Sequence, residues 1–184
     1  MMVLTLVKGD PRMIRSALCI AAASLACCAV QAQTANPVIK EARAQYDSVK
    51  TNLIKAADKM PADAYTFKPV PEIQDFGQRI AHVAGQIRTC GAVKGEQKQM
   101  GPVTNKAEIV AALKASFDEC DAAWDSMNDA SAVEMMAGRG GRGNPTSKLG
   151  TLIRNNNHDN EMYGYISVYL RLKGIVPPSS ERGM

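Results

Sequence analysis

Apolar residues recur every three or four positions along most of the chain, and this spacing predicts helices that each bury one face. The first predicted helix begins at Asn36 and Pro37, an N-cap residue followed by a proline at the first helical position, and ends at Pro61. The second follows Pro71, and Gly91 and Gly95 end it. Their apolar stripes are Val38, Ala42, Tyr46, Val49, Leu53 and Ala57 in the first helix, and Ile73, Phe76, Ile80, Val83, Ile87 and Cys90 in the second.

The second half of the chain predicts two more helices. One begins at Asn105, where Glu108 stands in the capping-box position three residues later, and the last runs from about Ser147 to Lys173. Gly174 ends the last helix. No segment alternates over a useful length with the period of two that marks a strand, so no sheet is expected. The sequence therefore predicts an all-α fold, a four-helix bundle.

The longest predicted connection covers residues 128–146 and includes the segment 138–143, which matches the pattern G-x-G-x-x-G. In dinucleotide-binding proteins this pattern follows a strand and opens a helix within a βαβ unit. No strand is predicted before it here. We therefore interpret the segment as a glycine-rich loop.

The first 32 residues have the three parts of a secretory signal peptide. Lys8, Arg12 and Arg15 precede an apolar run, residues 17–30, and a site with small residues ends at Ala32. This run of 14 residues is shorter than the about 20 that a membrane-spanning helix needs, so an uncleaved anchor is the weaker interpretation. We expect cleavage after Ala32, a periplasmic or secreted protein, and no membrane span after signal removal.

The mature domain is then residues 33–184. Met13 opens a more typical signal than Met1 does, because Asp10 is an unusual acid in the positively charged region, so Met13 is the candidate natural start. Processing as a lipoprotein at Cys27 is a weaker alternative.

Removal of residues 1–32 changes the charge and the cysteine content. Of 22 basic and 18 acidic residues, 19 and 17 remain, a net charge of about +2. This balance is not that of a nucleic-acid-binding protein, which needs a clustered basic surface, so no nucleic-acid partner is expected. Of five cysteines only Cys90 and Cys120 remain, in a compartment where cysteines can pair.

Polar side chains interrupt the apolar face of the last predicted helix. At about 100° per residue, Asn156 and Asp159 lie on the same face as Leu152 and Tyr163. Buried polar groups need hydrogen bonds or a metal, so this layer is a candidate ligand pocket; a solvent-filled mouth of the bundle is the alternative. A second stripe lies on the neighbouring arc and consists of His158, Met162, Tyr165 and Tyr169.

Three segments resemble the DinB family: residues 76–83 (FGQRIAHV), 158–164 (HDNEMYG) and 169–180 (YLRLKGIVPPSS). The resemblance covers about residues 38–180 and is most specific in the last segment. It implies a four-helix bundle with a long crossover connection, related to thiol-dependent transferases and isomerases. Many members of the family bind a divalent metal through three histidines, one on the second helix and two, four residues apart, on the last.

His82 and His158 match two of these ligand positions, although periodicity alone would leave His82 on the exposed face of its helix. The third position is Met162, and a thioether is a poor ligand for Zn²⁺ or Ni²⁺. Binding of zinc or nickel is therefore expected to be weak or absent, with Asp159 or Glu161 as candidate additional ligands.

The resemblance leads to two hypotheses. The first is an exported enzyme that depends on a divalent metal, of hydrolase or thiol-transferase type, with an incomplete three-histidine site and a small-molecule substrate. Its catalytic residues are not identified, although Tyr165 or Glu161 would be placed to move a proton. The second is a non-catalytic exported helical bundle, a binding protein that has lost the metal site. In both, Asn156, Asp159 and Tyr165 are the candidate pocket residues, and a homodimer is expected by analogy.

The crossover implied by the resemblance also bears on the two remaining cysteines. At about 1.5 Å per residue, Cys90 lies roughly 27 Å into the second helix and Cys120 roughly 21 Å into the third, so parallel helices would bring them to a similar level. Antiparallel helices would separate them. In a bundle with the crossover, a Cys90–Cys120 disulfide is feasible.

Overall fold

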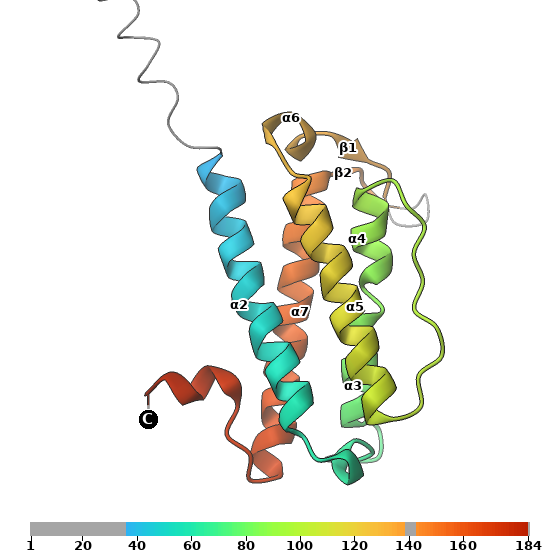
Figure 1. Cartoon of the computed structure of the whole chain (residues 1–184), viewed down its shortest axis with the longest axis vertical. Helices are drawn as coiled ribbons and strands as arrows, with labels where there is room; N and C mark the ends of the chain where they lie inside the picture. The colour runs from blue at the N-terminus through green and yellow to red at the C-terminus, as the bar shows by residue number, and fades with distance from the viewer. Residues whose placement is uncertain (1–35, 139–142, 184) are drawn as a thin grey trace, which may run out of the picture. The chain divides into compact units, whose positions relative to one another are not determined.

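The structure, a computed structural model, describes residues 36–138 and 143–183 (Figure 1). The predicted signal peptide, residues 1–32, and the centre of the glycine-rich loop lie outside these ranges. The helices of the bundle are α2 (Pro37–Lys59), α3 (Phe76–Ala84), α4 (Ile87–Val93), α5 (Lys106–Asp125) and α7 (Lys148–Leu172). Shorter elements are η2 (Ala62–Ala64), α6 (Asp129–Ala132), β1 (Met135–Met136), β2 (Thr146–Ser147) and η4 (Pro178–Gly183).

The helices form a four-helix bundle in which α3 and α4 together take the place of one helix. Figure 1 shows α3, α4 and α5 running in one direction and α2 and α7 in the other. Both α3 and α4 pack on α5, while α2 packs on α7. Because α4 and α5 are consecutive and parallel, residues 94–105 return along the length of the bundle as the crossover connection (Figure 1). The predicted all-α bundle with a crossover is confirmed.

Side-chain caps set the beginnings of the helices close to where the sequence predicts them. Asn36 Oδ1 accepts a hydrogen bond from the Ile39 N–H at the start of α2. Asn105 Oδ1 accepts from the Glu108 N–H at the start of α5. The Glu108 carboxylate, however, accepts from the Thr104 N–H rather than completing the predicted capping box at Asn105.

The second predicted helix differs from the structure at its start and in its middle. A helix beginning after Pro71 would include Ile73, but α3 begins at Phe76 because Asp75 is an N-cap with a complete capping box. The helix then breaks after Ala84, and α4 begins at Ile87. Gly85 lies at this break, where its low helix propensity makes an interruption inexpensive.

The connection between α5 and α7 contains more structure than the sequence predicts. It holds the single turn of α6 and an antiparallel pair of two-residue strands, β1 and β2. The expectation that there is no sheet is therefore wrong in this small respect. Strands of two residues are too short to produce an alternating pattern in the sequence.

The structure joins Cys90 and Cys120 by a disulfide, with a Cα–Cα distance of 4.9 Å. Both residues are buried, so the bridge ties the short α4 to α5 inside the core. Within the described ranges, no helix combines the length and the apolar character needed to span a bilayer.

Candidate functional site

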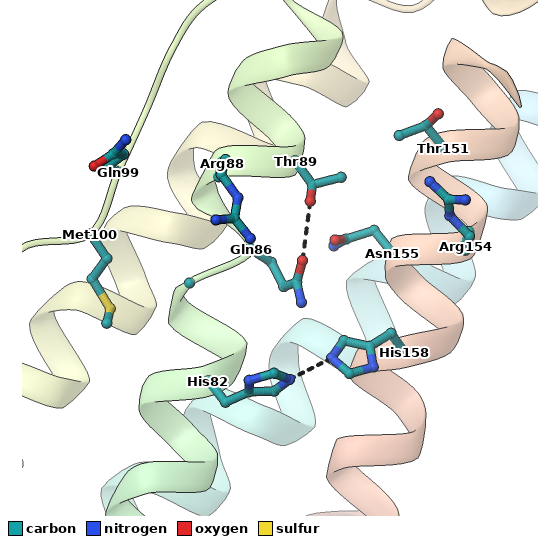
Figure 2. Close-up of a pocket in the computed structure, with 11 residues that line it drawn as sticks. His82, Gln86, Arg88, Thr89, Gln99, Met100, Thr151, Arg154, Asn155 and His158 are labelled. Atoms are coloured by element: carbon teal, nitrogen blue, oxygen red, sulfur yellow. Dashed lines mark hydrogen bonds between the residues drawn. The ribbon is translucent and has the colours of Figure 1, made fainter. Parts of the chain in front are cut away.

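Two histidines from different helices meet on one side of the bundle. His82 lies on α3 and His158 on α7, and their Nε2 atoms are 2.9 Å apart (Figure 2). At this distance one ring donates a hydrogen bond and the other accepts it, so their tautomers are coupled. His82 belongs to the exposed side of α3, as its periodicity predicts, but its side chain reaches across to α7.

The second ring nitrogen of His158 faces a carboxylate. Glu161 Oε2 lies 3.9 Å from His158 Nδ1, and Glu161 Oε1 accepts a hydrogen bond from the Tyr165 hydroxyl at 3.0 Å. This hydrogen bond raises the pKa of the Tyr165 phenol. The carboxylate thus lies beside the ring nitrogen of His158 that does not face His82, too far from it for a hydrogen bond.

The position that the resemblance assigns to a third histidine has different chemistry here. Met162 is buried, and Arg79 Nη1 lies 4.0 Å from its sulfur. The Arg79 guanidinium is held there, because its Nε donates to the Tyr169 hydroxyl at 3.3 Å and its Cζ lies 4.7 Å from the centre of the Tyr165 ring. A divalent cation near Met162 would meet a poor ligand and a like charge.

The donor set therefore does not fit a closed three-histidine metal site. In the part of the chain that the structure describes, no cluster of three His, Cys, Asp or Glu side chains has the arrangement of a metal site. Two imidazoles do converge on one point, and this pair is what remains of the predicted ligand set.

A pocket of roughly 710 Å³ opens beside the histidine pair, between α4, α7 and the crossover connection (Figure 2). His82, Gly85 and His158 form one part of its lining. The other lining residues are polar apart from Met100. They are Gln86, Arg88, Thr89, Gln99 and Met100 on one side, and Thr151, Arg154 and Asn155 on α7.

The three residues predicted to line a pocket do not line this one. Asn156 and Asp159 are buried inside the bundle, at 6% and 1% exposure, and Tyr165 is 44% exposed and lies outside the pocket. The alternative placed Asn155, Asn156 and Asn157 at a solvent-filled mouth of the bundle; Asn156 is buried, whereas Asn157 is exposed. The pocket receives Asn155 instead, since successive helical residues point about 100° apart and a polar run does not show which member faces the cavity.

Asp159 is linked to the pocket through Asn155. Asn155 Nδ2 donates a hydrogen bond to Asp159 Oδ2 at 3.1 Å, and burial raises the pKa of the Asp159 carboxyl well above its usual range. Among the described residues, neither Asp159 Oδ1 nor Asn156 Oδ1 has a hydrogen-bond partner. Removal from water without a compensating cation explains the preference of Asp159 for its proton.

Three solved structures share this fold. A DinB-like protein from Bacillus cereus is 16% identical with a TM-score of 0.64, over 76% of this chain and 95% of that one. A DinB-like protein from Bacillus subtilis is 16% identical with a TM-score of 0.60, over 73% and 92%. A conserved protein from Enterococcus faecalis is 12% identical with a TM-score of 0.59, over 75% and 98%.

No family model and no curated protein matches the sequence. At identities of 16% or less the structural matches concern the fold alone. The chain has a DinB-like fold, as its sequence motifs predict.

Proposed function

We propose that this protein is a binding protein with a DinB-like fold, and that it takes a small polar molecule into the pocket between α4 and α7. A volume of roughly 710 Å³ is typical of small-molecule sites, and the pocket offers hydrogen-bonding groups on opposite sides. One observation favours this function over that of an enzyme with a tightly bound metal. The Arg79 guanidinium contacts the Met162 sulfur at the position of the third metal ligand.

The proposal is tested by filling the pocket. Gln99 lies on the crossover connection and lines the pocket, so Gln99→Trp would occupy part of its volume. Gln97→Trp is the matched control, because Gln97 is exposed on the same connection and does not line the pocket. The parent and both variants are dialysed against a small-molecule extract, and bound compounds are measured by mass spectrometry. We expect enrichment by the parent and Gln97→Trp and its loss in Gln99→Trp; equal enrichment by all three would contradict the proposal.

A metal-dependent enzyme, of hydrolase or thiol-transferase type, is the second candidate, and one observation favours it. Two nitrogens each about 2.05 Å from one ion would lie ~2.9 Å apart at a right-angled site and ~3.3 Å apart at a tetrahedral one. The His82 and His158 Nε2 atoms are 2.9 Å apart, within this range, so rotation of the two rings would let both nitrogens face one ion in place of their hydrogen bond. Such an ion would polarise a substrate group or activate water or a thiol at its open positions.

Zinc binding distinguishes the two candidates. The second candidate requires the parent to bind zinc at micromolar concentration and His158→Ala to lose at least tenfold in affinity. The binding-protein proposal expects no such difference, because two imidazoles without a third strong ligand hold zinc weakly. Titration calorimetry of both proteins, after treatment with a chelator, decides between them.

We further propose that the domain works outside the cytosol, in the periplasm or after secretion. The signal-like residues 1–32 and the Cys90–Cys120 disulfide both support this location, because disulfides persist in oxidising compartments.

A further inference from the structure

We infer that the ligand of this pocket carries an oxyanion group, a carboxylate or a phosphate, which Arg88 and Arg154 bind from opposite walls. The inference rests on the proposed function, since it assigns a chemical class to the molecule that enters the pocket. Arg88 comes from α4 and Arg154 from α7, and both line the cavity (Figure 2).

These two arginines differ from the others whose side chains the structure describes. Arg43 pairs with carboxylates, Arg79 bonds to Tyr169, and Arg171 donates to Ser180. Within residues 36–138 and 143–183, neither the Arg88 nor the Arg154 guanidinium makes a hydrogen bond, an ion pair or a ring contact. Each guanidinium thus retains its fork of N–H donors, the geometry that matches a carboxylate or phosphate in a bidentate contact.

The rest of the lining does not neutralise this charge. No Asp or Glu is among the described residues that line the pocket. The nearest acid linked to it, Asp159, lies behind Asn155 and is buried. Positive charge on two walls, without a lining carboxylate, favours an anion over a cation or a neutral apolar molecule.

One neutral group adds a donor directed at the same space. Gln86 Oε1 accepts a hydrogen bond from the Thr89 hydroxyl at 3.1 Å, which fixes the orientation of the Gln86 amide. Its NH₂ end then lies toward the histidine pair, between the two walls (Figure 2). A ligand rich in acceptor oxygens would satisfy the amide as well as the guanidinium groups.

The experiment uses three probes at constant ionic strength: inorganic phosphate, succinate, and succinamide as the neutral analogue of succinate. Binding to the purified protein is measured by titration calorimetry. Arg88→Gln/Arg154→Gln removes both pocket charges while keeping two long polar side chains. Lys40→Gln/Lys68→Gln is the matched control, because it removes two exposed positive charges that do not line the pocket.

We expect the parent and the lysine control to bind phosphate or succinate with affinities within twofold of one another, and the arginine variant to bind at least tenfold more weakly. Comparison of phosphate with succinate identifies which oxyanion the pocket prefers. Arg154→Lys retains charge but not the fork, and a loss in this variant would support bidentate recognition. Circular dichroism checks that each variant is folded.

Two results would overturn the inference in different ways. If succinamide binds as tightly as succinate and the arginine variant is unaffected, the oxyanion assignment is wrong while the pocket remains a binding site. If none of the three probes binds at millimolar concentration, the oxyanion assignment is wrong, and the comparison of Gln99→Trp with Gln97→Trp decides separately whether the pocket binds any small molecule.

Discussion

Arg79 reaches Met162 across the interface between α3 and α7, with its Nη1 atom 4.0 Å from the methionine sulfur. Arg79 is three residues before His82, and Met162 is four residues after His158, so both lie one helical turn from the histidine pair. The site thus differs from a three-histidine centre in two respects. It lacks one imidazole, and it has a positive charge at the level where that imidazole would stand.

The first prediction is that Met162→His restores metal binding only in part, and that Met162→His/Arg79→Leu restores it further. His158 and residue 162 can converge on one ion with His82, but Arg79 would repel it. At a free zinc concentration of a hundred times Kd, a folded-state site adds roughly 2.7 kcal/mol to the free energy of unfolding. Urea denaturation with and without zinc measures this gain.

His82→Ala in the double variant is the control for that prediction, and it should abolish the gain. If zinc stabilises neither variant more than the parent, the assignment of His82, His158 and position 162 to one ligand set is wrong.

The second prediction concerns the pH dependence of stability. Because burial raises the pKa of Asp159 in the folded state, folding takes up a proton between its unfolded pKa, about 4, and its higher folded pKa. The contribution of Asp159 to the free energy of unfolding is therefore greatest below pH 4, and it is lost as the pH rises through the folded pKa. Asp159→Asn removes this loss, which amounts to roughly 1.4 kcal/mol for each unit of pKa difference.

Urea denaturation of the parent and Asp159→Asn at pH 4 and pH 7 measures this effect. The variant should gain stability over the parent mainly at pH 7. A difference that is the same at both pH values would show that Asp159 does not titrate differently in the folded and unfolded chain.

The third prediction is that reduction destabilises the protein by about 3 to 4 kcal/mol, because the Cys90–Cys120 bridge closes a loop with a sequence separation of 30. Thermal denaturation with and without a reductant measures the loss. Cys90→Ala/Cys120→Ala should be less stable than the parent and insensitive to the reductant. All of these measurements use protein without residues 1–32, so two titratable thiols in the denatured, unreduced parent would contradict the prediction.

The fourth prediction is that export removes residues 1–32 and leaves Gln33 as the first residue. Intact mass spectrometry of protein recovered from the periplasm or medium identifies the terminus. A product that retains Cys28, or one with a lipid on Cys27, would show that a different processing route operates.

Local features of the sequence predicted the four helical stretches of the bundle, although not the break that divides one of them into α3 and α4. The Asn36–Pro37 start, the Asn105 cap and the spacing of apolar residues involve neighbours only a few positions apart, so they can be recognised before the fold is known. The motifs around His82 and His158 led to the DinB-like bundle, which the structural matches confirm. The apolar pattern did not predict the break at Gly85 in the second helix, because the apolar stripe continues past this one residue of low helix propensity.

The candidate site depended on contacts between distant residues. Periodicity describes the direction of a Cβ atom from its own helix, so it left His82 exposed, whereas the long imidazole side chain reaches His158 on a helix 76 residues away in sequence. No local feature of the sequence predicts the contact of Arg79 with Met162. None predicts that Arg88 and Arg154 share one pocket either, because the rotation of the helices and the crossover decide which residues meet. The sequence alone thus determined the helices and their bundle, while tertiary packing decided which polar side chains face one another.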